Sequence, residues 1–378
     1  MIIVTNYICL IGTENANELY SQIDQIDKQL ASKCSFYGNY TQFLNTQYKD
    51  IKNALKEGEV AIDFTDFKLD SVHCYAAYVL RKEWVSSYVR GNFYNRGRIS
   101  TESLRASDDL IFLNVHPNKD GSLSFENPRA FQGKGVTTWE GLIKSVRAKV
   151  KGTKVKIRLG ASSGEWKAMV ADEAARTTFA KNIKTVLEKN KLDGIDLDFE
   201  WAENEKEYKD YSLAILKMRE VLGDKYLFSV SLHPVCYKIS KEAIEAVDFI
   251  SLQCYGPSPV RFPIEKYCSD IQMVLEYGIP KEKLVAGVPF YGVTKDNSKK
   301  TEAYFNFVQN GLVTSPAQNE VIYQGDTYVF DGQDNIRIKT RYAKEQKLKG
   351  MMSWDLATDL PLSDSRSLLK TMTEELRE

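Results

Sequence analysis

Acidic residues recur at close spacing in residues 192–201, which read Leu-Asp-Gly-Ile-Asp-Leu-Asp-Phe-Glu-Trp. Because side chains alternate between the two faces of a β-strand, Asp196, Asp198 and Glu200 would share one face there. The intervening Ile, Leu and Phe would form an apolar opposite face, suited to packing against helices. Burial and crowding of three carboxyl groups would raise their pKa values, so that some would hold protons at neutral pH. Since such a cluster weakens a fold, it is a candidate for acid–base chemistry.

Two other interpretations of this acidic row remain open from the residues alone. It could be the polar face of an exposed strand in an antiparallel sheet, or it could bind magnesium or calcium, which prefer oxygen ligands. No second acidic cluster complements it, and His73, His116 and His233 fit no metal-ligand spacing. His73 and Cys74 are adjacent, which in an extended segment turns them to opposite faces and disfavours a Cys/His dyad. We therefore expect no metal and no cofactor.

A series of short apolar strands alternating with longer amphipathic helices begins at residue 84. Parallel strands need such crossover helices, and eight repeats favour closure into an eight-stranded parallel β/α barrel of the TIM type. In that fold the acidic face would point into the barrel, and Glu200 would stand at the carboxyl end of its strand, where barrel enzymes place their chemistry. The strands are predicted over residues 84–90, 109–115, 154–160, 194–200, 226–233, 247–254, 283–289 and 350–355.

The first part of the chain differs in character and predicts an N-terminal α+β extension. Spaced apolar residues in the polar stretch 14–57 indicate a helical pair, and residues 59–64 and 72–80 read as two strands around a polar turn. The stretch 55–81 resembles the opening of a CHAT (caspase-like) domain, which implies a fragment without the His and Cys that act further downstream in that family. No Pro/Gly/Ser-rich linker follows, and we expect the barrel to fold independently of the extension. The predicted domains are 1–82 and 83–378.

The composition narrows the classes of partner. The chain has 51 basic and 51 acidic residues, a balance that disfavours general attraction to nucleic acid or to an anionic membrane. No stretch approaches the apolar length of a membrane span, and a neutral substrate and a monomeric protein are expected. Six cysteines without CxxC spacing read as free thiols. The first residues lack the basic region of a signal peptide, which predicts a cytoplasmic location as written, or a secreted or cell-surface one if this N-terminus is not native.

The acidic row gives the sequence a specific resemblance. The spacing Asp193-x-x-Asp196-x-Asp198-x-Glu200 is similar to the DxxDxDxE signature of family 18 glycoside hydrolases, the chitinases and endo-β-N-acetylglucosaminidases. Three further segments follow in the family's order. Residues 251–255 resemble its sixth-strand QxY element, 286–292 its seventh-strand motif, and 350–355 its eighth strand with a tryptophan. The resemblance covers roughly residues 84–376.

The resemblance implies a retaining, endo-acting hydrolase that cleaves β-1,4 bonds next to N-acetylglucosamine, as in chitin-type oligosaccharides. Glu200 would protonate the leaving oxygen and later act as base toward water. The nucleophile would be the carbonyl oxygen of the substrate's own 2-acetamido group, the substrate-assisted exception among glycosidases. Asp198 would orient that group and share a proton with Asp196, and Tyr255 would donate a hydrogen bond to the acetamido carbonyl. The implied substrate-binding residues are Trp354, as a flat floor for the sugar ring, Gln253 and Tyr291.

The sequence departs from the family pattern at three places. Gly256 follows Tyr255 where the family usually has Asp or Asn, and residues 160–164 match the third-strand SxGG element only loosely. The segment between the seventh and eighth predicted strands is too short to suggest the α+β insertion that deepens many chitinase clefts, which predicts a shallow cleft. Two alternative functions follow: an endo-β-N-acetylglucosaminidase acting on the N-glycan chitobiose core, and a non-catalytic, lectin-like barrel. Glu200, the acid whose loss usually marks the lectins, is present and favours the enzyme.

Overall fold

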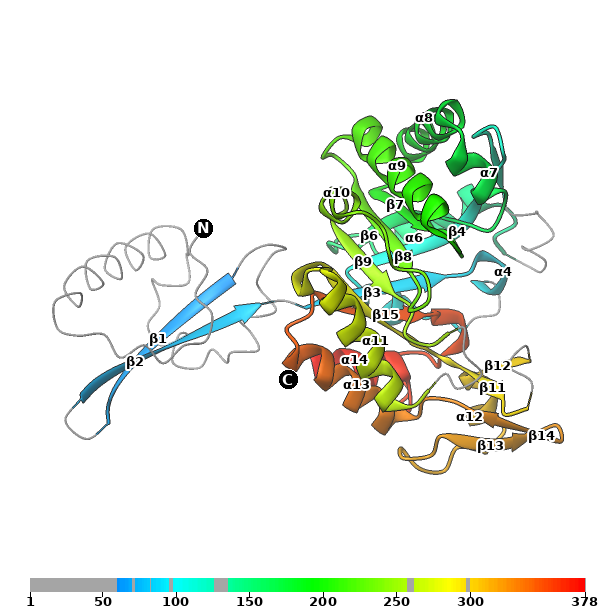
Figure 1. Cartoon of the computed structure of the whole chain (residues 1–378). Coiled ribbons are helices and arrows are strands. Elements are labelled where there is room, and N and C mark those ends of the chain that lie inside the picture. The colour runs from blue at the N-terminus through cyan, green and yellow to red at the C-terminus, as the bar shows by residue number, and fades with distance from the viewer. Residues whose placement is uncertain are drawn as a thin grey trace. The chain divides into compact units, whose positions relative to one another are not determined.

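The computed structural model describes residues 60–69, 72–81, 83–94, 98–125, 135–256, 262–296 and 300–377. The chain divides into two compact units, Met1–Lys82 with Arg377–Glu378, and Glu83–Leu376. In the first unit, strands β1 (Val60–Leu69) and β2 (Val72–Arg81) form an antiparallel hairpin (Figure 1). The helical pair predicted over 14–57 and the start of the CHAT-like stretch lie outside the described residues.

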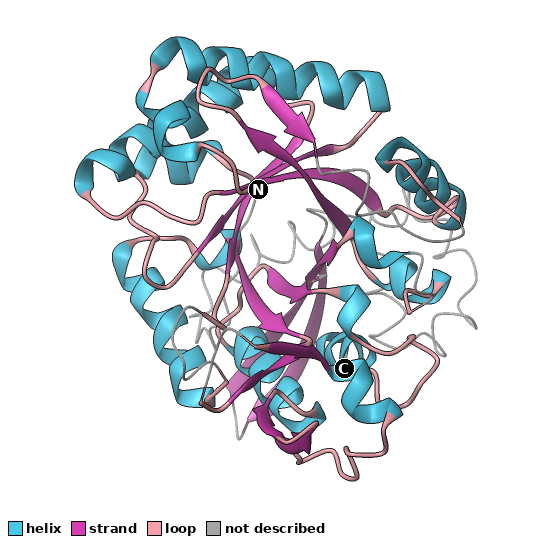
Figure 2. Ribbon diagram, turned by 90° about the vertical axis from the view of Figure 1, so that its right-hand side faces the viewer, coloured by secondary structure: helices cyan, strands magenta, loops and turns pink. Residues whose placement is uncertain are grey.

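The second unit is built on eight parallel strands that close into a barrel, which confirms the predicted TIM-type fold (Figure 2). Closure comes from β3, which pairs with β15 on one side and β4 on the other. The short strand β5 (Leu123–Phe125) adds antiparallel to the end of β4. The barrel strands are β3 (Trp84–Val89), β4 (Asp109–Pro117), β6 (Lys156–Ser162), β7 (Gly194–Asp198), β8 (Leu227–Leu232), β9 (Phe249–Leu252), β10 (Leu284–Pro289) and β15 (Gly350–Trp354).

Helices surround the ring of strands (Figure 2). In α9 the buried residues Tyr211, Ile215 and Met218 recur at helical spacing, which gives the helix one apolar face. The side chain of Asn204 begins this helix by accepting a hydrogen bond from the backbone N–H of Glu207. The helices around the barrel are α4 (Gly91–Tyr94), α5 (Thr101–Ala106), α6 (Trp139–Lys149), α7 (Trp166–Ala171), α8 (Glu173–Asn190), α9 (Glu205–Leu222), α10 (Lys241–Ala246), α11 (Ile264–Tyr277), α13 (Gln333–Glu345) and α14 (Leu368–Arg377), with 3₁₀ turns η2 (Lys281–Lys283) and η3 (Leu356–Thr358).

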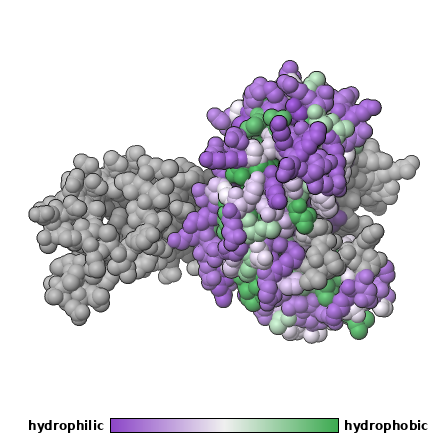
Figure 3. All heavy atoms as spheres, in the orientation of Figure 1, coloured by the Kyte–Doolittle hydropathy of each residue, from purple (hydrophilic) through white to green (hydrophobic). Residues whose placement is uncertain are grey.

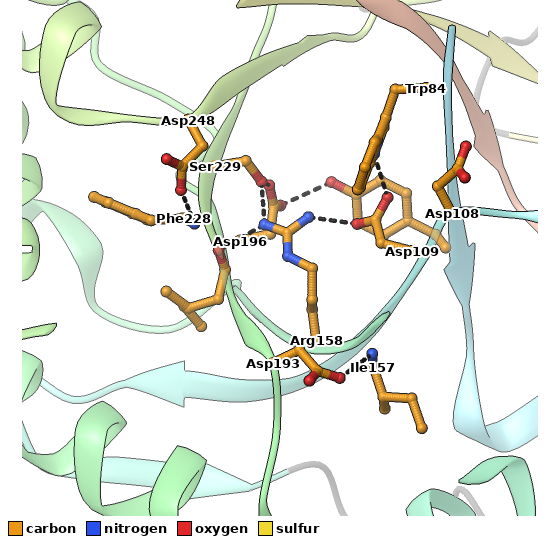
Figure 4. A network of polar contacts seen from close by, with 12 residues as sticks. Trp84, Asp108, Asp109, Ile157, Arg158, Asp193, Asp196, Phe228, Ser229 and Asp248 are labelled. Carbon is orange, nitrogen blue, oxygen red and sulfur yellow. Dashed lines mark hydrogen bonds and ion pairs between the residues drawn. The ribbon is translucent and has the colours of Figure 1, made fainter. Parts of the chain in front are cut away.

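Aspartates at the amino ends of three strands fix the barrel register. Asp108, Asp193 and Asp248 immediately precede β4, β7 and β9. Each accepts a hydrogen bond from a backbone N–H of the preceding barrel strand, at 2.9 Å from Val85, 2.7 Å from Ile157 and 2.6 Å from Phe228. Figure 4 shows the bonds to Ile157 and Phe228. Asp193, the first acid of the signature, therefore lies at the end of β7 opposite to Glu200 and serves the fold.

A small antiparallel sheet is inserted between the last two barrel strands. It contains β11 (Tyr291–Thr294), β12 (Thr301–Ala303), β13 (Glu320–Tyr323) and β14 (Asp326–Val329), with helix α12 (Tyr304–Gln309) between β12 and β13. The prediction that this segment is too short for an α+β insertion is therefore wrong.

The insertion fits into few residues because its strands have only three or four residues each. The turn between β13 and β14 is tight, with positive φ at Gln324 (51°) and Gly325 (86°), as a two-residue type I′ hairpin requires. Glycine at the second of these positions, between two runs rich in β-branched and aromatic residues, is the sequence signal for this hairpin.

The visible face of the barrel unit is mostly hydrophilic, with apolar residues in small scattered groups (Figure 3). Large exposed apolar side chains among the described residues are Phe125, Leu213, Val235, Tyr277, Ile322 and Ile338. Within the described ranges, no helix combines the length and the apolar character needed to cross a membrane.

Candidate active site

Strand β7 carries two of the three predicted acids into the barrel interior. Asp196 is fully buried and Asp198 is 5% exposed, whereas Ile195 and Leu197 face the hydrophobic core that the helices share. The apolar face fixes this orientation, because burying an Ile or Leu side chain contributes about 1.5–3 kcal/mol. β7 ends at Asp198, two residues earlier than predicted, and Glu200 lies beyond the strand with its side chain exposed to solvent.

A single side-chain amide joins the two outer carboxyl groups. Gln253, directly after β9, donates from Nε2 to Asp198 Oδ1 at 2.9 Å and to Glu200 Oε1 at 3.1 Å. Such donors favour the ionised form of a carboxyl group. The structure thus places Gln253, a residue predicted to bind substrate, between two of the predicted catalytic acids.

Three hydroxyl groups surround Asp196, and none of them is among the residues predicted from the sequence. The Tyr88 hydroxyl, on β3, donates to Asp196 Oδ2 at 2.8 Å, the Ser229 hydroxyl donates to Oδ1, and the Ser231 hydroxyl lies 3.4 Å from Oδ2. Ser229 and Ser231 alternate along β8, and this polar stripe in an otherwise apolar strand is the signal that could have identified them. Tyr88 gives no comparable signal in the sequence.

Burial and crowding shift the pKa of both aspartates upward. The pKa of Asp198 lies well above its usual value, chiefly because the group is buried and further because Glu200 and Asp196 are close. Burial also raises the pKa of Asp196, while the positive charge of Arg158 and hydrogen bonds from Ser229 and Tyr88 oppose that rise. Since two neighbouring buried carboxylates repel each other, these forces favour one proton shared between the two aspartates.

Tyr255 is buried beside the carboxyl groups, in the loop after β9. Its ring meets that of Tyr291 edge-on, with centroids 6.4 Å apart. Burial raises the pKa of the Tyr255 hydroxyl well above its usual value, so this group stays protonated and able to donate a hydrogen bond. Gly287 makes room for the ring, because a Cβ there would lie 3.1 Å from Tyr255 Cε1 and 2.7 Å from the carbonyl oxygen of Leu252.

Trp354 ends β15 and is half-buried. Its ring centroid lies 5.2 Å from that of Tyr88, and the side chain also packs against the cluster formed by Phe262, Tyr291 and Val293. The Arg90 guanidinium lies 5.7 Å from the centre of the Trp354 ring. Contacts through Tyr88, Tyr291 and the acidic row therefore connect all seven predicted site residues into one group.

An ion pair and two cis peptide bonds lie next to these side chains. Arg90 Nε forms an ion pair of 2.5 Å with the fully buried Asp355, which follows Trp354. The peptide bonds Glu200–Trp201 and Trp354–Asp355 are both cis.

In the described part of the chain, no set of three or more His, Cys, Asp or Glu side chains is arranged to hold a metal ion. The acids are instead surrounded by hydrogen-bond donors, hydroxyl groups at Asp196 and the amide of Gln253 at Asp198 and Glu200. Donors of this kind suit carboxyl groups that exchange protons.

The sequence pattern that defines the Glycosyl hydrolases family 18 matches residues 83–359. The chain belongs to this family. The match covers most of the barrel unit, including every site residue described above. The family signature Asp193-x-x-Asp196-x-Asp198-x-Glu200 is thereby divided in space, with Asp193 at the amino end of β7 and the other three acids toward its carboxyl end.

Among proteins with which this family 18 chain can be compared, the probable chitinase 2 of Drosophila melanogaster is 23% identical in an alignment 273 residues long that covers 54% of this chain and 56% of that protein. The chain spans about half the length of the curated relatives it matches. A GH18 chitinase, ChiB, from Flavobacterium johnsoniae superposes with a TM-score of 0.64 at 23% identity, over 78% of this chain and 94% of that one. The chitinase-like agglutinin RobpsCRA from Robinia pseudoacacia superposes with a TM-score of 0.63 at 17% identity, over 77% and 99% of the two chains. These structures share the barrel fold.

Proposed function

We propose that this family 18 chain is a retaining, endo-acting, chitinase-type hydrolase that cleaves β-1,4 bonds next to N-acetylglucosamine with help from the 2-acetamido group of its substrate. The observation that carries the proposal is the Gln253 bridge between a buried and an exposed acid, Asp198 and Glu200. An exposed acid can reach a glycosidic oxygen, while a buried one next to it suits a polar group held beneath the sugar.

In the first step Glu200 gives its proton to the leaving oxygen as the glycosidic bond breaks. The acetamido carbonyl oxygen attacks the anomeric carbon from the opposite face and forms an oxazolinium intermediate. In the second step Glu200, now a carboxylate, takes a proton from water, whose oxygen replaces the acetamido oxygen at the anomeric carbon. Two inversions give net retention, as in substrate-assisted glycosidases.

Asp198 supports this route better than direct attack by a protein carboxylate. It is buried and its pKa is raised, so it holds a proton readily and is a poor nucleophile. Its position next to Glu200 suits a hydrogen bond to the acetamido N–H, and the negative charge that the aspartate pair keeps would offset the positive charge of the oxazolinium. Asp196 shares the proton of this pair.

The aromatic residues supply contacts to the sugar. Tyr255, whose raised pKa keeps its hydroxyl protonated, would donate to the acetamido carbonyl and hold it beneath the anomeric carbon. Trp354 is half-buried and would offer its exposed surface to the apolar face of the ring. Tyr291 begins the inserted sheet, so we expect substrate contacts to extend to the insertion, which removes the reason for predicting a shallow cleft.

A second candidate is sugar binding without turnover. The barrel superposes on a chitinase-like agglutinin as well as on chitinases, and Gly256 stands where a polar residue is expected next to Tyr255. The presence of Glu200, held by Gln253, favours the hydrolase.

The test incubates the full chain with chitopentaose and a high-mannose glycopeptide together and identifies products by mass spectrometry. We expect cleavage of chitopentaose into shorter chitooligosaccharides. Release of a glycan that leaves one N-acetylglucosamine on the peptide would instead identify an endo-β-N-acetylglucosaminidase. If both substrates stay intact while chitopentaose binds in a calorimeter, the protein is a lectin and the proposed hydrolysis is refuted.

A further inference from the structure

The barrel interior holds a fully buried arginine below the acidic row. Arg158, on β6, forms an ion pair of 2.5 Å with the equally buried Asp109 on β4. Its other terminal nitrogen donates to the Ile195 carbonyl at 2.7 Å and to the Ser229 hydroxyl at 2.5 Å. Trp84 Nε1 donates to the remaining oxygen of Asp109 at 2.7 Å (Figure 4). Because both terminal nitrogens are paired, this buried charge has a fixed position, and it acts on its surroundings through a low dielectric.

One hydroxyl group connects this arginine to the inner acid. A guanidinium has only donors and does not lose its proton in proteins, so the Ser229 oxygen must accept from Arg158. The single hydrogen of that hydroxyl then points to Asp196 Oδ1, to which Ser229 donates. Tyr88 donates to the other oxygen of Asp196 at 2.8 Å. Asp196 therefore receives a hydrogen bond on each oxygen, which is the pattern of a carboxylate rather than of a carboxylic acid.

Asp198 has a different environment. Its hydrogen-bond donor is the neutral amide of Gln253, and the charged groups nearest to it are the acids Glu200 and Asp196. We propose that Arg158, with Asp109 as its counter-ion, is a positioning residue that holds Asp196 as the carboxylate, so that the proton of the aspartate pair resides on Asp198. This inference rests on the proposed function, since it assigns the proton within the same acid–base site.

The titratable and charged groups that face the aspartate pair come from every neighbouring element. They are Tyr88 on β3, Asp109 on β4, Arg158 on β6, Glu200 after β7, Tyr211 on α9 and Tyr255 after β9. Arg158 is the one cation among these described groups. Removing it should make the second protonation of the pair easier, and removing Asp109 should make it harder.

The experiment measures kcat/KM on chitopentaose as a function of pH and follows the acid limb, the loss of activity toward low pH. Asp109→Asn removes a negative charge and strengthens the effect of Arg158, so the acid limb should move to lower pH. Arg158→Met combined with Asp109→Asn removes both charges, and because Arg158 acts on Asp196 more strongly than Asp109 does, the limb should move to higher pH by about one unit.

A matched control is the buried ion pair of Lys339 and Asp331, 2.6 Å apart at α13. Neutralising it with Lys339→Met and Asp331→Asn removes a comparable pair and should leave the acid limb in place. If the acid limb moves to lower pH in Asp109→Asn and to higher pH in the double variant, the proposal is supported. A mere loss of packing would not shift the acid limb in a direction that follows the charge removed. Equal shifts, or none, overturn it.

A second readout does not need turnover. Carboxyl carbon shifts of ¹³C-aspartate in the Glu200→Gln protein, assigned with Asp196→Asn and Asp198→Asn, report which aspartate titrates at lower pH. We expect Asp196 to be ionised while Asp198 is still protonated. The reverse order overturns the proposal even if the unmodified protein hydrolyses chitopentaose. If the aspartates titrate in the expected order but the unmodified protein does not hydrolyse chitopentaose, only the proposed function is refuted.

Discussion

Replacing Gln253 with leucine removes the amide between Asp198 and Glu200 while keeping a side chain of similar volume. The variant loses hydrogen bonds of 2.9 Å to the buried Asp198 and 3.1 Å to the exposed Glu200. With the proton of the pair on Asp198 and Glu200 acting as an acid, both acceptors are neutral carboxyl groups, and each hydrogen bond contributes about 0.5–1.5 kcal/mol. Lost in the transition state, a total of roughly 1–3 kcal/mol corresponds to a loss in kcat/KM of about 5- to 160-fold.

The same variant should change the pH profile. The hydrogen bond from Gln253 lowers the pKa of Asp198, so its loss raises the apparent pKa of the aspartate pair. The pair then takes up its second proton at higher pH, and the acid limb of kcat/KM moves upward.

The assay compares initial rates on chitopentaose for Gln253→Leu with those for a matched control, Gln272→Leu. Gln272, on α11, donates to the Tyr342 hydroxyl at 2.8 Å and touches none of the acids. The control should keep its activity and its pH profile. If Gln253→Leu stays within about threefold of the unmodified protein, the bridge does not hold the general acid and the reasoning is refuted.

Four further substitutions separate catalytic from structural residues. Glu200→Gln should lose at least about 10²–10⁴-fold in kcat on chitopentaose yet bind it in calorimetry, and unchanged turnover would show that the proton comes from elsewhere. Tyr88→Phe removes the 2.8 Å hydrogen bond that lowers the pKa of Asp196, so the acid limb should move to higher pH. A move to lower pH would contradict a stabilising hydrogen bond from Tyr88 to the Asp196 carboxylate. Gly287→Ala places a Cβ 3.1 Å from Tyr255 Cε1 and should destabilise by about 1–3 kcal/mol in denaturant titration while raising KM. Asp193→Ala orphans the Ile157 N–H, now bonded at 2.7 Å, and should cost about 1–3 kcal/mol of stability with near-normal kcat, which a large kcat loss would disprove.

The sequence predicts the barrel well because its strands are short apolar runs separated by amphipathic helices. The acidic row is also predictable, since alternation along β7 alone separates Asp196 and Asp198 from Ile195 and Leu197. The residue at which that strand ends is harder to predict, because pairing with neighbouring strands decides where β7 stops. Glu200 lies beyond this end.

What the sequence does not reveal are contacts between distant strands. Tyr88, Ser229 and Arg158 reach Asp196 or its neighbours from three other strands, and of these only Ser229, in the polar stripe of β8, has a local sequence signal. A buried arginine reads from sequence as an exposed polar residue in a strand, because its partner Asp109 is 49 positions away. The inserted sheet is hard to predict for a different reason, namely that its strands are shorter than the runs that periodicity can identify.

The junction between β3 and β15 has a consequence for how the protein is made. A hydrogen bond of 2.9 Å joins Ser353 to Ser87 across this junction, 266 positions apart in the sequence. Tyr88 and Trp354 come together across the same junction. Contacts of such separation form late, after the loops between them have closed.

During translation, a nascent chain that has not yet released β15 from the ribosome therefore lacks Trp354, the residue proposed to bind the sugar ring, and the partner that closes the barrel at β3. Its acids are already synthesised, but the ring around them is open to water. Activity should thus appear in a single step once β15 has left the ribosome, and terminated chains that lack β15 should be inactive by-products for proteases to remove.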